Sequence, residues 1–322
     1  MGVKGDIIEM VNETREFAMD GIPPSNAYDG KRPVRFEAYK LDEKTGGITY
    51  APDRGAQGAT IYPLEFPITS GIKGCTLVVF KCQPMQLFEL VDPQSLRALP
   101  AISVFRARTE TEPRKFGYAI TQPEAWVSHV DAQAVVFGQP EEEKIMHDEN
   151  GKPFTVHVAD PDSLKIVMSA GPAAKRLLLL NTTEPDPDDP QKKPNPVGIG
   201  YRVDQWPSIY FTPLKVATDM YNLDDMRIEK LAAFRIINKN INNLHELCAE
   251  ELEKAKAALD ELRYDEYGAH ARAAWGYEAR GYPDVEKTAN DVVKGVLFYL
   301  ALLLPFRSEE HTSELPSRQS IS

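Results

Sequence analysis

Short catalytic signatures are absent from this sequence. It contains no G-x-S-x-G, no Walker loop and no dinucleotide fingerprint, because Gly55–Gly58 lacks the third glycine. His245 begins a pattern like that of a zinc-protease helix, but Ala249 stands where the second histidine belongs. His147 and His157 belong to an expected hairpin that could bring them together, yet the acidic residues beside them indicate a solvated rim. We therefore assign no catalytic residue, no cofactor-binding residue and no metal ligand.

Cysteine is scarce, and positive charge is in deficit. The chain has three cysteines, and 37 basic against 48 acidic residues give a formal net charge of −11. Binding to phosphates needs a basic surface, so nucleic acid is excluded as a partner. Cys75 and Cys82 flank one expected strand about 23 Å apart on opposite faces, so they cannot bridge each other. A disulfide to Cys248 stays open, and the redox compartment is not settled.

No secretory or myristoylation signal is present at Met1–Asp6. These residues form no apolar stretch, and the sixth position lacks the required Ser or Thr. We interpret residues 1–33 as a linker or a fragment of an upstream region.

Long apolar runs are also rare, and the main one is Gly295–Phe306, with the sequence GVLFYLALLLPF. It is shorter than the roughly 20 apolar residues that span a bilayer. A helix that is apolar on every face is either a membrane span or a deeply buried core helix. We favour a juxtamembrane segment and the start of a transmembrane helix over 283–306, with a core helix as the alternative.

The residues after Phe306 resemble a translated sequencing-library adaptor. Arg307–Ser317 has the sequence RSEEHTSELPS, and only Pro316 departs from the adaptor translation RSEEHTSELQS. We expect 307–322 to be a non-native tail and exclude it from fold reasoning. The expected membrane helix is then truncated, and the native protein would continue the apolar run in place of Arg307.

Strand-like runs with turn residues between them fill the chain from 34 to 182. They lie at 34–41, 48–50, 59–68, 75–82, 101–107, 115–120, 133–138, 154–158, 164–168 and 175–180. Runs of this length and spacing predict an all-β, sandwich-like region. Residues 183–212 form a proline-rich connector, whose acidic cluster does not fit an EF-hand loop because Gln191 replaces the sixth-position glycine.

From Thr212 the pattern becomes helical. Thr212 is expected to be the N-cap of a helix, followed by Pro213 at the first helical position. An apolar stripe then repeats every three or four residues, and Arg263–Asp265 breaks it. A second helix is expected to end at Gly281, with Pro283 opening the next one. These features predict a long α-helical hairpin over 213–282.

The stripe has two explanations, intramolecular packing and a coiled-coil dimer. A dimer would use Ile237, Ile241, Leu244, Leu252, Leu259 and Leu262. Trp126, Trp206 and Trp275 could stack on a sugar, although core packing is the ordinary role of each.

Four stretches together resemble a region of large bacterial membrane proteins with FtsX-like permease segments and carboxypeptidase-regulatory-like β-domains. They are Leu87–Leu96, Gly198–Pro207, Ala273–Asp284 and Asn290–Phe306. In such proteins an extracytoplasmic β region and a helical hairpin lead into transmembrane helices. The resemblance brings no catalytic or binding residues.

The sequence therefore predicts an α+β fold. We expect a membrane-anchored, non-enzymatic domain of a larger protein, with its bulk outside the cytoplasm and coupled to an FtsX-like permease. One alternative is a soluble, dimerising adaptor of β strands and a helical hairpin. The other is a carbohydrate-binding or hydrolytic β-domain.

Overall fold

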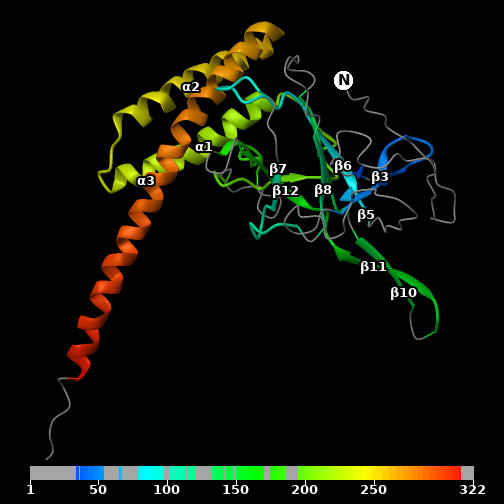
Figure 1. Cartoon of the computed structure of the whole chain (residues 1–322), viewed down its shortest axis with the longest axis horizontal. Coiled ribbons are helices and arrows are strands. Elements are labelled where there is room, and N and C mark those ends of the chain that lie inside the picture. Colours follow the sequence, from blue (N-terminus) through cyan, green and yellow to red (C-terminus); the bar gives the residue numbers. More distant parts are fainter. Residues whose placement is uncertain are drawn as a thin grey trace, which may run out of the picture.

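A computed structural model describes residues 34–35, 37–53, 65–66, 79–97, 102–113, 115–120, 132–140, 142–147, 150–169, 175–185 and 195–312. Strands come first and helices last, as the change of hydrophobic period near Thr212 predicts (Figure 1). The α+β fold class is confirmed. Residues 223–262 contain no strand, and the described residues between 130 and 180 contain no helix.

One four-stranded sheet consists of β7 (Ile102–Arg106), β12 (Ser163–Ser169), β13 (Lys175–Leu179) and β14 (Tyr201–Arg202). Strand β12 is central: β7 runs antiparallel along one edge, and β13 and β14 share the other. Ile166 on β12 pairs with Val104 and with Leu179, and all three side chains are buried. These neighbouring apolar residues make one face of the sheet part of the core.

A second four-stranded sheet consists of β6 (Gln83–Leu87), β8 (Gly117–Ile120), β9 (Ala134–Gly138) and β15 (Ser208–Ile209). Its pairs are antiparallel, except that β15 runs parallel to β6. Smaller sheets pair β1 (Val34–Arg35) with β4 (Glu65–Phe66), β10 (Glu142–His147) with β11 (Pro153–Ala159), and β2 (Lys40–Leu41) with β3 (Ile48–Pro52) and β5 (Val79–Lys81). Most of the expected runs at 59–68 and 75–82 lies outside the described residues, as do residues 1–33.

The two strands on either side of Asp160–Asp162 belong to different sheets. β11 pairs with β10, whereas β12 pairs with β7, β13 and β14. Asp162 anchors this crossover, because its Oδ2 accepts a hydrogen bond from the Gln139 N–H at 2.8 Å and its own N–H donates to the Gln139 carbonyl at 3.0 Å. A short polar segment between two strands therefore does not form a hairpin here.

The helices are α1 (Thr212–Ala233), α2 (Lys239–Asp260) and α3 (Tyr264–Thr312). Pro213 lies in the first turn of α1, as expected, but the expected N-cap is wrong: Phe211 is the N-cap, and Thr212 is already in the helix. The side chain of Asn238 caps α2 by accepting from the N–H groups of Asn240 at 3.0 Å and Ile241 at 3.4 Å. The break between α2 and α3, at residues 261–263, lies two residues before the expected break at Arg263–Asp265.

The expected helix end at Gly281 and restart at Pro283 are wrong. α3 runs through both residues without interruption. Gly281 does not have the positive φ of a glycine that ends a helix. Tyr282 and Val285 are both buried, so packing holds the helix on each side of the exposed Pro283. Tertiary contacts here outweigh the local cost of proline, which is about 3 kcal/mol in a helix interior.

The sheets and the helices share one hydrophobic core. It contains Met85 from one sheet, Ile166 from the other, and Met220, Cys248 and Trp275 from the three helices. Figure 1 shows the helices together on one side of the sheets, with the second half of α3 and the β10–β11 hairpin extending away from the body. The core therefore crosses the predicted division between the β region and the helical hairpin.

Candidate functional site

The second half of α3 exposes apolar side chains in every direction. Eight large apolar residues between 293 and 303 are 46% to 68% exposed. They are Val293, Val296, Leu297, Phe298, Tyr299, Leu300, Leu302 and Leu303. The five consecutive positions from 296 to 300 are all exposed, so apolar atoms surround the helix axis. We call Val293–Leu303 the apolar segment.

The first half of α3 is packed in the opposite way. The buried side chains there recur every three or four residues, at Tyr267, Ala271, Trp275, Ala279, Tyr282 and Val285. They contact the core and the other two helices. One continuous helix therefore belongs to the core at its start and exposes apolar side chains to solvent further on. An exposed apolar surface of this kind is typical of a membrane or protein contact.

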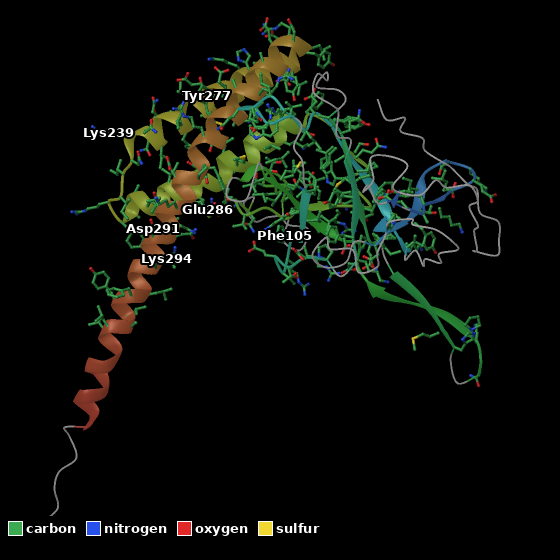
Figure 2. The ribbon with its side chains drawn as sticks, viewed as in Figure 1. Phe105, Lys239, Tyr277, Glu286, Asp291 and Lys294 are labelled. Carbon is green, nitrogen blue, oxygen red and sulfur yellow. The ribbon has the colours of Figure 1, made fainter. Side chains whose placement is uncertain are left out.

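Charged residues precede the apolar segment where α3 leaves the body, and one, Lys294, lies in its first turn. Figure 2 shows Glu286, Asp291 and Lys294 in order along this part of the helix. Beyond Lys294, the charge-free run Gly295–Phe306 has twelve residues, a helical length of about 18 Å against about 30 Å for a bilayer core. Accordingly, among the described residues no helix carries an apolar stretch that could cross a membrane.

A buried polar cluster joins the three helices above this exit point. Nδ1 of His245 on α2 lies 2.8 Å from Oε1 of Glu278 on α3, and Nε2 lies 3.4 Å from Oδ1 of Asp225 on α1. The Tyr221 ring stacks on the imidazole at 4.1 Å between centroids. Glu278 is only 3% exposed, so its contacts with protein groups replace its contacts with water.

Asp224 and Arg227 on α1 complete the cluster. Arg227 donates from Nη1 to Oδ1 of Asp224 at 3.1 Å and lies 5.1 Å from the centre of the Tyr282 ring. Oδ2 of Asp224 is buried and has no hydrogen-bond partner. Burial, together with the charge of Glu278, raises the pKa of Asp224 to about 8. The protonated acid is therefore the favoured form of Asp224 at neutral pH.

His245 is shifted toward its charged form. Burial acts to lower the pKa of His245, but the hydrogen bonds and charges of Glu278 and Asp225 outweigh burial and raise it. Burial also raises the pKa of the Cys248 thiol, which stays protonated. The arrangement suits an ion pair that locks α1, α2 and α3 together.

A second buried carboxylate, Asp219, ties α1 to the end of β13. Its oxygens accept from the N–H groups of Leu180, Asn181 and Thr182 at 2.7 to 2.9 Å, and from the Thr182 hydroxyl at 2.7 Å. The Tyr201 hydroxyl is 3.3 Å away. Burial raises the pKa of Asp219, whereas the donors favour the carboxylate. This residue holds the helical layer on the sheet.

The structure separates His147 and His157, the two histidines of the β10–β11 hairpin. His147 pairs with Pro153 across the β10–β11 hairpin, whereas His157 pairs with Glu143, so the two histidines stand near opposite ends. His245 contacts Glu278 and Asp225 instead of a metal partner. No group of three potential metal ligands is found in the part of the chain that is described.

The three tryptophans have different positions. Trp275 is fully buried in the core. Trp206 is partly buried, with Lys215 Nζ 4.7 Å from its ring centre and Tyr201 edge-on at 5.3 Å. Trp126 lies outside the described residues, together with Gly55–Gly58. Trp206 and Trp275 therefore serve packing rather than an open sugar platform.

Cys82 and Cys248 are buried and form no disulfide with each other. Cys75 is outside the described residues, and so are residues 186–194 of the proline-rich connector.

The apolar stripe on α2 packs mainly within the molecule. Ile241, Leu244 and Leu252 are buried, and Leu259 packs against a small core cluster with α3. Ile237 lies before the start of α2, and both Ile237 and Leu262 are 67% exposed. A dimer through this stripe would thus depend on the two exposed residues at its ends, Ile237 and Leu262.

The sequence contained a signal for the buried carboxylates. Asp224 falls in register with Val216 and Met220, and Glu278 with Trp275 and Tyr282. An acid at an apolar position of a helical stripe suggests a paired, buried charge.

Comparison with known proteins gives no match. Neither a protein-family description nor a curated protein nor a solved structure is similar to this chain.

Proposed function

We propose that this chain is an extracytoplasmic, non-enzymatic domain of a larger membrane protein, attached to the bilayer through the apolar segment of α3. The observation that carries the proposal is the exposure of apolar side chains on all sides of that helix. A helix that packs against one protein partner needs only one apolar stripe. A helix in a bilayer is surrounded by lipid and is apolar on every side. The extracytoplasmic location and the coupling to an FtsX-like permease rest on the sequence resemblance alone.

The packing of α3 supports a mechanical role. The same helix that carries the apolar segment also supplies Trp275 and Tyr282 to the core. The His245–Glu278 pair and Asp219 then connect it to α2 and, through α1, to the sheet. A displacement of the membrane end of α3 would pass to the β region as a rigid movement.

The β region would be the sandwich-like, membrane-distal module. Met85 and Val136 from one four-stranded sheet share a core cluster with Val104 and Ile166 from the other. Two sheets that bury their faces in one core favour this arrangement.

Flotation of the full chain with phosphatidylcholine vesicles tests the attachment. We expect the chain to float with the vesicles and the variant Leu297→Asp/Leu300→Asp to remain behind. Two aspartates within the hydrocarbon region cost about 5 kcal/mol, or about 4,000-fold in partition. Leu96→Asp, at a leucine that is 69% exposed in the β region, is the matched control and should float normally.

The competing function is a soluble adaptor that dimerises through exposed apolar residues. Sedimentation velocity without lipid separates the two. A full chain that is monomeric and does not bind vesicles contradicts membrane attachment. A dimer that does not bind vesicles favours the adaptor. Protease treatment of spheroplasts from cells that express the complete native protein tests the side of the membrane: cleavage of the body supports the extracytoplasmic location, and protection contradicts it.

A further inference from the structure

We propose that the loop between α1 and α2 is a second membrane contact, which binds the anionic headgroups of phospholipids. This inference rests on the proposed attachment through α3 and adds a lipid preference to it. We define the loop as Phe234–Asn238, between the end of α1 and the start of α2.

The loop presents large apolar side chains to solvent. Phe234 is 73% exposed, Ile237 is 67% exposed and Ile236 is 36% exposed. Every residue from 232 to 240 is exposed. Aromatic and aliphatic side chains in such a position suit the boundary between headgroups and acyl chains.

The loop is also locally basic in an acidic protein. Lys230, Arg235 and Lys239 lie within or beside it, and no acidic residue occurs between Glu229 and Glu246. The whole chain has a net charge of −11, so this concentration of positive charge is not a general property of the surface. Each basic residue near an anionic bilayer contributes about 1 kcal/mol to its attraction, which is about a fivefold gain in partition.

The loop lies at the membrane end of the helical layer. Figure 1 shows it at the end from which α3 projects, whereas the turn between α2 and α3 lies at the opposite end. Since α2 has 22 residues and packs along α3, its first residue, Lys239, lies roughly level with Glu286 (Figure 2). Val293 is then about 10 Å further along α3. That distance is comparable to the Debye length, about 8 Å at physiological salt, and to the reach of an arginine or lysine side chain.

The backbone fixes the loop in this orientation. The Ile236 N–H donates to the Leu231 carbonyl at 3.0 Å, and the Arg235 N–H donates to the Ala232 carbonyl at 2.8 Å. Arg235 has φ 62°, the left-handed conformation in which a helix end usually has glycine. A charged side chain therefore occupies the position where glycine would be the less strained choice.

The end of α2 offers a control with the same geometry. Leu262 has φ 60°, and the Arg263 N–H donates to the Ala258 carbonyl at 2.8 Å in the same pattern. Leu262 is 67% exposed, as is Ile237, but it lies at the end of the helices away from the projecting part of α3 (Figure 1).

Flotation of the full chain with two vesicle types tests the loop. One type contains phosphatidylcholine alone, and the other an equal mixture of phosphatidylcholine and phosphatidylglycerol. We expect tighter binding to the mixed vesicles, weakened by added salt. Arg235→Gln/Lys239→Gln should reduce the partition into mixed vesicles about 30-fold and leave that into phosphatidylcholine unchanged.

Two controls test whether the position of these side chains in the loop matters, rather than only their charge or apolar character. Lys44→Gln/Lys256→Gln removes two exposed positive charges elsewhere and should keep the preference for mixed vesicles. Ile237→Ser should weaken binding to both vesicle types, and Leu262→Ser should not.

The outcomes distinguish this inference from the proposed function. If the chain binds both vesicle types equally, or the Arg235→Gln/Lys239→Gln variant keeps its preference, the loop contact is overturned and attachment through α3 stands. If the chain binds neither type, both are overturned. Self-association without lipid that Ile237→Ser abolishes would overturn the inference in favour of a second copy of the chain.

Discussion

His245 on α2 and Glu278 on α3 form a buried pair, with Nδ1 and Oε1 2.8 Å apart, at the level where α3 is still held by the other helices. The imidazole is 11% exposed and the carboxylate 3% exposed. The pair connects the two helices that run antiparallel over most of α2, and Asp225 brings in α1. The proposed transmission of movement by α3 therefore depends on this pair.

Removal of His245 should destabilise the fold strongly. His245→Ala leaves Glu278 buried without its main partner, so we expect a loss of about 3 kcal/mol in the free energy of unfolding. His270→Ala is the control, because His270 also contacts a carboxylate, Glu251 at 2.6 Å, but is 31% exposed. That control should lose less than about 1 kcal/mol. Urea denaturation measures both, and equal losses would contradict a special role for the buried pair.

The stability of the helical layer should fall as the pH rises. His245 has a folded-state pKa above 6.5, so its contribution is complete below pH 6.5 and is lost as the pH passes the raised value. Asp224 shifts from 3.8 to about 8, so its contribution is lost between those values. Both effects have the same sign. We expect the free energy of unfolding to decrease from pH 5 toward pH 8.

Asp224→Asn tests the source of that slope. Asparagine resembles the protonated acid and can still accept from Arg227, so the variant should be more stable than the wild type at pH 8 and show a shallower slope. Denaturation at a series of pH values is the measurement. An unchanged slope would show that Asp224 is ionised throughout and would refute the assigned shift.

Asp219 should be needed for docking of α1 on the sheet. Asp219→Ala leaves the N–H groups of Leu180, Asn181 and Thr182 buried without an acceptor, and we expect a loss of 3 kcal/mol or more, roughly three unsatisfied donors at about 1 kcal/mol each. Asp42 makes a comparable set of contacts to Lys44 and Thr45 in an exposed turn. Asp42→Ala should have a much smaller effect, because water replaces the lost acceptor there. Equal effects would mean that Asp219 is not structurally special.

The sign of one glycine substitution tests the continuity of α3. A Cβ on Gly281 would lie 3.9 Å from Leu244 Cδ1, an ordinary contact, so Gly281→Ala should stabilise the helix by about 0.5–1 kcal/mol. If α3 ended at Gly281 in the left-handed conformation, the same change would destabilise it by about 1 kcal/mol. Gly46→Ala is the control, since Gly46 has φ 70° and open space around it. It should destabilise, and thermal unfolding would record both signs.

Features set by local periodicity could be predicted from the sequence. The spacing of Ile241, Leu244, Cys248 and Leu252 gives the buried face of α2, because a period of 3.6 residues decides which side of a helix is apolar. The turn between β2 and β3 also has a local cause, because Gly46 there has a positive φ. Such features need no information about distant parts of the chain.

Features set by distant contacts could not be predicted. The pairing of β12 with β7, and of β15 with β6, joins strands far apart in the sequence, and no local pattern specifies the partner. The uninterrupted passage of α3 through Pro283 depends on contacts of Tyr282 and Val285 on either side. The buried Glu278 was hidden because acids are usually solvent-exposed, although its register with Trp275 pointed inward.

The depth of the apolar segment in a bilayer is the most direct test of membrane attachment. An environment-sensitive fluorophore would be attached to Leu300→Cys and, separately, to Leu262→Cys in the full chain, with the unsubstituted chain treated identically as the blank. Vesicles with quenchers at different depths would then locate each label. We predict that the label at position 300 lies among the acyl chains while the label at 262 remains in water. A label at 300 that stays in water, or equal quenching at both positions, would contradict attachment through α3.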